Sequence, residues 1–158
     1  MKLPQADPLA SALEFLRISE ATYHYCRLAA PWGLLLREGC PMFHAVTSGR
    51  CWMEVPGACT QLLEPGNFVV IPHGNGHRLY SDLSADFQNP KDVPSEKISK
   101  RCELFRIEGE GPETTMICGE LNFNHPAADW LVPLFPKVIH ARAPVDHSRP
   151  HAEISDRN

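Results

Sequence analysis

Apolar and polar residues alternate along much of the chain, in short segments that are separated by turns. Residues 42–48 and 51–55 alternate on either side of a turn at Gly49, and Pro56-Gly57 marks the next turn. Because successive side chains of a β-strand point to opposite faces, this pattern predicts strands, and the close spacing of the turns predicts consecutive hairpins. Further strand-like segments are residues 21–28, 32–36, 58–63, 101–108 and 114–123.

The segment from Gly66 to His77 combines a turn, a strand, a second turn and a histidine. Its residues 68–71 are an apolar run with β-branched side chains, and Pro72 ends the run because proline has no N–H to donate to a neighbouring strand. The glycines that follow allow the backbone to turn sharply before a new strand opens at His77. We therefore predict two strands joined by a tight turn at the mouth of a barrel.

Three segments depart from the strand pattern. Leucines recur at helical spacing after Asp7-Pro8, which predicts a short helix within residues 1–20. Residues 81–100 lack apolar periodicity and are predicted to form a long loop. A short helical turn is expected at residues 127–134, followed by an extended piece at residues 137–141.

The overall organisation follows from these segments. We predict one all-β domain with its barrel at residues 21–141 and a disordered tail at residues 142–158, which is polar and interrupted by prolines. A length of 158 residues suits a single domain, and 15 prolines with 10 glycines fit a fold with many turns.

Charge and hydropathy narrow the class of partners. The net charge of −4 offers no cationic surface for phosphates, so direct nucleic-acid binding is not expected. The amino terminus lacks the apolar run of a signal peptide, and no stretch approaches the roughly 18 apolar residues of a membrane span. We expect a cytoplasmic protein without a membrane partner.

The spacing of the cysteines is also typical of a cytoplasmic protein. The six cysteines are spread singly, without CxxC spacing, in a chain without a secretion signal. They are predicted to be reduced, and most of them to be small core residues.

The pattern G-x5-P-x-G-x2-H in residues 66–77 matches the second conserved motif of the cupin barrel. The chain also carries further residues typical of one group of cupins: Phe43-His44, Gly49, Trp52, Cys118-Gly119, Phe123 and His125-Pro126. With these residues and the motif, it resembles the amino-terminal cupin domain of AraC-type transcription regulators over roughly residues 7 to 140. The resemblance implies a double-stranded β-helix barrel of the jelly-roll type, a regulatory role and a homodimer. It also implies a helix-turn-helix half that this chain lacks, so we expect either a stand-alone cupin or a fragment of a longer regulator.

The metal ligands of cupins are only partly present. The second-motif ligand corresponds to His77, whereas the His-x-His positions fall near Leu35 to Glu38 and the glutamate position near Met42. His44 lies on the same strand face as Met42 and is expected to point inward.

Two interpretations of the interior remain open. His44 and His77, together with His73 or Cys118, would form the nitrogen and sulfur set that zinc prefers. Alternatively, His44 and His77 form a hydrogen-bonded pair that lines a small-ligand pocket with Trp52 and no metal. His24 is expected to be an ordinary strand histidine.

We therefore predict a ligand- or metal-binding regulatory domain rather than an enzyme. The alternative is a metal-dependent oxygenase, isomerase or hydrolase, for which the carboxylates in or next to predicted strands are Glu38, Glu54 and Glu103. A third alternative is a structural barrel whose histidines only fill the interior. Cupins occur in all these roles, so fold analogy alone does not choose among them.

Overall fold

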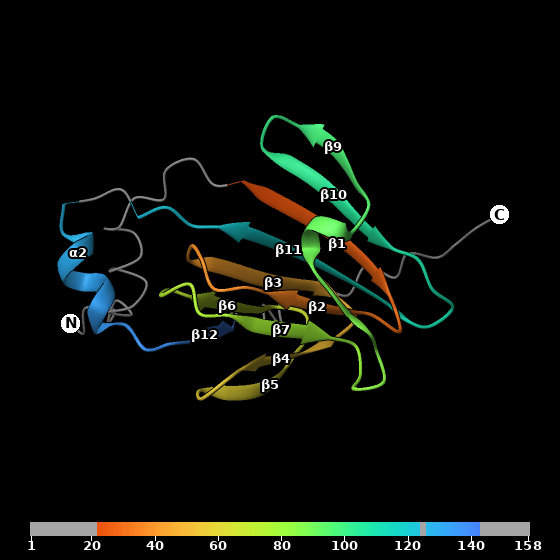
Figure 1. Cartoon of the computed structure of the whole chain (residues 1–158), viewed down its shortest axis with the longest axis horizontal. Coiled ribbons are helices and arrows are strands. Elements are labelled where there is room, and N and C mark those ends of the chain that lie inside the picture. Colours follow the sequence, from red (N-terminus) through yellow and green to blue (C-terminus); the bar gives the residue numbers. More distant parts are fainter. Residues whose placement is uncertain (1–21, 124–125, 143–158) are drawn as a thin grey trace, which may run out of the picture.

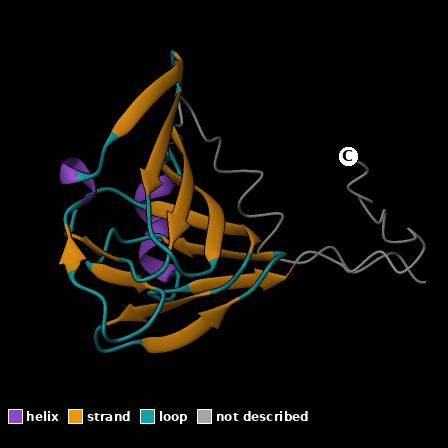
Figure 2. Ribbon diagram, turned by 90° about the vertical axis from the view of Figure 1, so that its right-hand side faces the viewer, coloured by secondary structure: helices purple, strands orange, loops and turns teal. Residues whose placement is uncertain are grey.

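A computed structural model of the chain describes residues 22–123 and 126–142, and these residues form two facing β-sheets (Figures 1 and 2). The larger sheet has seven strands in the order β12 (Ile139–Arg142), β6 (Asn67–Ile71), β3 (Met42–Ser48), β11 (Glu113–Glu120), β1 (Tyr23–Ala29), β10 (Cys102–Ile107) and β9 (Ser95–Ser99). The smaller sheet has five, in the order β5 (Cys59–Leu63), β4 (Cys51–Val55), β7 (His77–Tyr80), β2 (Gly33–Leu36) and β8 (Phe87–Gln88). The predicted all-β cupin fold is confirmed.

Alternation along the strands places the core between the sheets. In β4, Cys51, Met53 and Val55 are almost fully buried, whereas Trp52 is 39% exposed on the opposite face. The same alternation in β3 makes His44 and Val46 core residues. Burial of these inward apolar side chains is the main stabilising contribution in such a two-layer fold.

Strand pairing brings distant parts of the chain to one place. In the antiparallel pair of β3 and β11, His44 lies opposite Cys118, and Cys118 lies opposite His24 of β1. In the smaller sheet, His77 at the start of β7 lies opposite Leu36 at the end of β2.

Two turns lock together at the end of the sandwich where β7 begins. The N–H of Gly39 donates to the carbonyl oxygen of Gly74 over 2.9 Å. Gly74 has a φ of +66°, and a Cβ added there would lie 1.8 Å from the carbonyl oxygen of Gly39. Only glycine fits this close approach, which confirms the predicted tight turn after Pro72.

The long loop predicted for residues 81–100 is wrong in part. It contains β8, the 3-10 helix η1 (Pro90–Asp92) and β9, which is exposed along its whole length. An edge strand with exposed side chains carries no apolar alternation, so the sequence pattern gave no sign of it.

Near the carboxyl end, the predicted helical turn is confirmed as α2 (Ala128–Leu131) followed by η2 (Val132–Leu134), and the last extended piece as β12. The predicted amino-terminal helix and the predicted disordered tail lie outside the described residues, apart from residue 142 at the end of β12.

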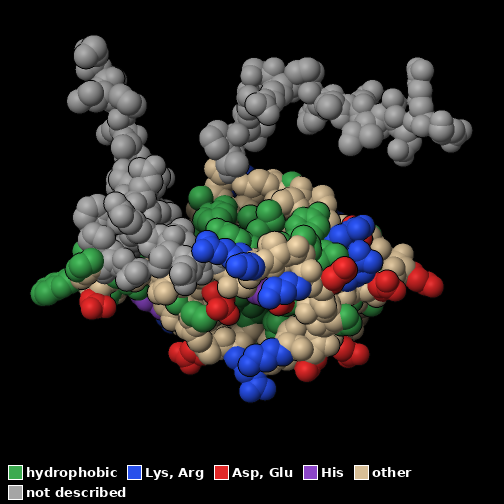
Figure 3. Space-filling view, turned by 90° about the horizontal axis from the view of Figure 1, so that it is seen from above, with side chains coloured by type: hydrophobic (Ala, Val, Ile, Leu, Met, Phe, Trp, Pro, Cys, Tyr) green, Lys and Arg blue, Asp and Glu red, His purple; other side chains and the backbone are tan. Residues whose placement is uncertain are grey.

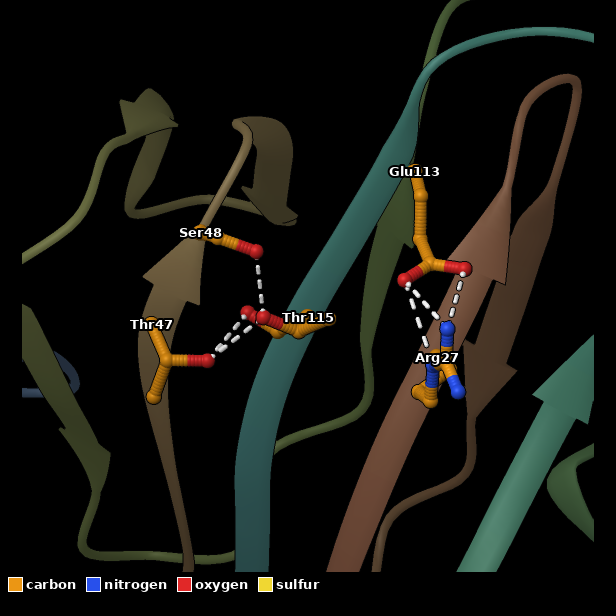
Figure 4. A network of polar contacts seen from close by, with 5 residues as sticks. All are labelled: Arg27, Thr47, Ser48, Glu113 and Thr115. Carbon is orange, nitrogen blue, oxygen red and sulfur yellow. Dashed lines mark hydrogen bonds and ion pairs between the residues drawn. The ribbon is translucent and has the colours of Figure 1, made fainter. Parts of the chain in front are cut away.

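Polar contacts hold the end of the larger sheet where β3 ends and β11 begins (Figure 4). The hydroxyl of Thr47 contacts the Thr115 hydroxyl at 2.6 Å and donates to the Thr115 carbonyl at 3.1 Å, while the Ser48 hydroxyl contacts the Thr115 hydroxyl at 2.5 Å. Arg27 and Glu113 point toward one another from β1 and β11 and form an ion pair at 3.2 Å. These contacts flank the irregularity in the β3–β11 pairing between Thr115 and Met116.

The two long sides of the sandwich differ. On one side, Gln61 of β5 and His140 of β12 join the sheet edges through a hydrogen bond of 3.0 Å. On the other side, the edge strands are β8 and β9, and the segment that carries η1 connects them (Figure 1). The segment that carries η1 on this second side lines a cavity between the sheets.

Candidate functional site

Three buried side chains from different strands form a continuous chain of contacts in the interior. The Nδ1 atom of His44 lies 2.9 Å from the Cys118 sulfur, and its Nε2 atom lies 2.7 Å from Nε2 of His77. The Nδ1 atom of His77 lies 2.9 Å from the carbonyl oxygen of Asn75. His44 is 0% exposed and His77 is 2% exposed.

The contacts determine which nitrogen of each histidine carries a proton. A carbonyl oxygen only accepts, so Nδ1–H of His77 donates to Asn75 and leaves Nε2 of His77 as an acceptor. Nε2–H of His44 therefore donates to His77, and Nδ1 of His44 accepts from the thiol of Cys118. Every polar atom along this chain has a partner while all three side chains are neutral.

Burial favours this neutral state. It lowers the pKa of His44 well below the usual range, with the charge of His77 as a second cause, and it lowers the pKa of His77 against the opposing effect of the Asn75 carbonyl. The pKa of the Cys118 thiol is raised, first by its contact with Cys26 and then by burial. The thiol is therefore not poised as a thiolate nucleophile.

A cavity of about 570 Å³ lies next to His44 and Cys118, on the side of the sandwich that η1 borders. Its floor includes His44, Cys118 and Cys26, all of which are buried. Its walls are mainly apolar and come from both sheets: Leu34, Leu36, Met42, Leu79, Val93 and Phe105. A mostly apolar cavity with a few polar groups is typical of a small-molecule site.

The structure separates the remaining predicted site residues from this cavity. His44 lines the cavity, whereas His77 does not. Trp52 lies on the outer face of β4 and does not line the cavity either. His73 is exposed in its turn, and its Nε2 atom lies 2.7 Å from the carbonyl oxygen of Phe135.

The described geometry does not fit zinc as it stands. Two histidine nitrogens on one tetrahedral zinc lie about 3.3 Å apart, given bonds of about 2.0 to 2.1 Å, whereas the Nε2 atoms of His44 and His77 are at hydrogen-bonding distance. Cys118 contacts the other nitrogen of the His44 ring. Within residues 22–123 and 126–142, no three His, Cys, Asp or Glu side chains are placed to hold a metal ion.

Sequence reasoning missed the residues that form one wall of the cavity. His24 of β1 lines it, and the His24 ring stacks on Phe105 with ring centres 4.6 Å apart. Cys26 shares the inward face of β1, and Glu103 of β10 lies opposite His24. Alternation did place His24 and Cys26 on one strand face, but only the β1–β10 pairing shows that this face borders a cavity.

The three carboxylates considered for an enzyme are not assembled into one group. Glu38 and Glu103 line the cavity, and Oε2 of Glu103 lies 4.0 Å from Nδ1 of His24. Glu54 is bound to Arg78 by contacts of 2.7 Å and does not line the cavity.

A second cavity, of about 660 Å³, lies between α2, η2 and the residues that follow β11. It contains none of the predicted site residues. Cys40 and Glu120 line both cavities and separate them.

Comparison with known proteins gives two matches. The profile of the family described as Cupin matches residues 7–155. The RCS-specific HTH-type transcriptional activator RclR of Escherichia coli (strain K12) is 28% identical over 126 residues, which are 78% of this chain. The match covers 34% of RclR, so the chain spans about a third of the length of this relative. Separately, no helix among the described residues has the length and apolar character needed to cross a membrane.

Proposed function

The chain belongs to the cupin family and resembles the amino-terminal domains of AraC-type regulators, and from this premise we propose that it is a regulatory domain that binds a small molecule between its two sheets. The observation that carries the proposal is the cavity of about 570 Å³. It lies within the usual size range of small-molecule sites, roughly 300 to 1,000 Å³.

The polar groups of the cavity support binding rather than catalysis. Both nitrogens of His44 are engaged, and the Cys118 thiol is held neutral. A candidate general base needs a free lone pair within reach of a substrate, and His44 has none in this arrangement. Ligand recognition requires only shape and a few polar contacts, which the walls provide.

Binding is tested by thermal unfolding in the presence of a panel of small organic molecules. A ligand at about 100 times its dissociation constant adds about 2.7 kcal/mol to the free energy of unfolding, which raises Tm by roughly 5 to 10 °C in a chain of this size. Ser95→Trp places a large side chain at the cavity wall, and Ser99→Trp makes the same change on β9 away from the cavity.

We expect to find compounds that raise the Tm of the parent protein and of Ser99→Trp but not that of Ser95→Trp. Equal stabilisation of both variants would place binding elsewhere and contradict the proposal. Thermal unfolding of the two variants without ligand controls for damage to β9 itself.

A second candidate function is metal binding by His44 and His77. The observation that favours it is the bond from Nδ1–H of His77 to Asn75, because ligating histidines usually donate their other N–H to a carbonyl or carboxylate. A metal would have to replace the shared proton and separate the two Nε2 atoms, and it would supply Lewis acidity at the cavity floor.

Elemental analysis of untagged protein, purified without chelator, tests this candidate. Near one equivalent of zinc or another transition metal that is lost in both His44→Ala and His77→Ala would support it, with His73→Ala as the matched control. Equal metal content in all four proteins, or none in the parent protein, would contradict it.

For the regulatory role, we propose that ligand binding changes a homodimer surface through the segment that carries η1. Val93 in this segment lines the cavity and is buried, so a ligand contacts the segment directly. Sedimentation with and without a hit compound measures the change in association. A monomer at high concentration in both states would contradict the dimer, and this result is independent of whether the cavity binds.

A further inference from the structure

Two basic side chains at the cavity mouth have no acidic partner among residues 22–123 and 126–142. Arg37 follows β2 and Lys91 lies in η1, so they reach the cavity from different segments. Both residues are exposed. Neither forms an ion pair with a residue in the described part of the chain, where the ion pairs involve His24, Arg27 and Arg78 as the basic partners.

Three carboxylates also line the cavity: Glu38, Glu103 and Glu120. Oε2 of Glu103 lies 4.0 Å from Nδ1 of His24, and neither Glu38 nor Glu120 forms an ion pair among the described residues. None of the three carboxylates pairs with Arg37 or Lys91, so these two cations are available to an anion at the mouth. The space-filling view from above shows basic and acidic side chains mixed over the face that carries β9 and β10 (Figure 3).

Behind the mouth, the walls suit a flat apolar group. Phe105 presents a ring that is stacked on His24 at an interplanar angle of 16°, and leucine and methionine side chains face it from the other strands. The Nδ1 atom of His24 is buried without a hydrogen-bond partner, so this wall also has an unused polar atom for a bound molecule. Aromatic stacking against such a wall is favourable beyond the burial of apolar area.

We propose that this cavity takes a small organic acid with a flat apolar body, whose carboxylate binds Arg37 and Lys91 while the body lies against Phe105. This inference rests on the proposed function, because it names the ligand class of the same cavity. Arg37 and Lys91 can both donate charge-assisted hydrogen bonds to one carboxylate, whereas an amine of the same shape would be repelled by both cations.

The test uses three probes of the same length and different charge: 3-phenylpropionate, 3-phenylpropylamine and 3-phenylpropanol. Dissociation constants are measured by ligand-observed NMR on the full chain. The acid is expected to bind at least about tenfold more tightly than the alcohol, which corresponds to one charge-assisted hydrogen bond, and the amine more weakly than the alcohol.

Arg37→Gln and Lys91→Gln are each expected to weaken the acid about tenfold and to leave the alcohol unchanged. Arg106→Gln removes the same charge from the outward face of β10 and is expected to change neither. Because Arg37, Lys91 and Arg106 are exposed, these variants keep the packed interior.

Two outcomes overturn the inference in distinguishable ways. If the alcohol or amine binds at least as tightly as the acid and Ser95→Trp abolishes that binding, the cavity is a ligand site but the ligand class is wrong. If the acid binds equally to the parent protein, Ser95→Trp and Arg37→Gln, or if no probe binds, both the anion site and this use of the cavity fail.

Discussion

The Nε2 atoms of His44 and His77 lie 2.7 Å apart in the interior, although the two residues are 33 positions apart in the sequence and belong to different sheets. This contact joins the two layers of the sandwich through one proton. With Cys118 on one side and the Asn75 carbonyl on the other, it forms a neutral polar chain inside an apolar core.

Replacing His44 with alanine is expected to destabilise the fold strongly. The change leaves a cavity and removes the partners of the Cys118 thiol and the His77 ring, which are both buried. We expect a loss of about 2 to 4 kcal/mol in the free energy of unfolding, measured by urea denaturation. His73→Ala, at an exposed position, is expected to cost less than about 0.5 kcal/mol, and equal losses for the two variants would refute the polar chain.

Acid is expected to weaken the chelator-treated protein. The folded-state pKa values of His44 and His77 are lowered from 6.5, so the unfolded chain binds protons first as the pH falls. Their stability contribution is present above about pH 6.5 and is lost progressively below it, by up to about 1.4 kcal/mol per pH unit for each histidine.

Urea midpoints between pH 7 and pH 5.5 measure this slope. His44→Gln should reduce it, whereas His73→Gln should leave it as in the parent protein. A slope that is unchanged in His44→Gln would show that other groups cause the acid sensitivity.

Gly74→Ala is expected to disrupt the two locked turns. Its Cβ would lie 1.8 Å from the Gly39 carbonyl oxygen, and φ is +66°, so the side chain meets both a backbone clash and an unfavourable conformation. We expect a loss of more than about 2 kcal/mol.

Gly57→Ala provides the matched control, because its φ is +75° but the nearest atom to an added Cβ is the Lys137 Nζ at 3.8 Å. It should cost only the conformational penalty of about 1 kcal/mol. Similar denaturation midpoints for the two variants would show that the contact between the turns contributes little.

Cysteine labelling should distinguish exposed from core thiols. Cys40 is exposed, whereas burial raises the pKa of Cys51 to about 12 and leaves it almost fully covered. Iodoacetamide at pH 8, followed by mass spectrometry of peptides, should modify Cys40 in the native protein and Cys51 only after unfolding. Native labelling of Cys51 at a rate close to that of Cys40 would contradict the described core.

Several features could be predicted from the chain alone because they depend on local chemistry. The alternation in β3 and β4 placed His44 inside, and the prolines and glycines around residues 65–76 predicted the turn before His77. The all-β class followed from the positions of turns and inward residues, which are properties of short segments, and the resemblance of residues 66–77 to a cupin motif implied the cupin fold.

Other features could not be predicted in this way. The edge strand β9 has no apolar face for a periodicity to report, and the partners of His24 became visible only when β1 paired with β10.

The sequence by itself determined most of the strands, the turn before His77 and the inward position of His44, since these follow from side-chain alternation and backbone preference. Only the tertiary structure decided that Cys118 and His77 meet His44 on opposite sides of one ring, while His73 and Trp52 lie elsewhere. The physical reason is that strand register and the separation of the two sheets set distances between residues remote in the chain. A difference of about half an ångström between hydrogen bonding and metal coordination depends on those distances alone.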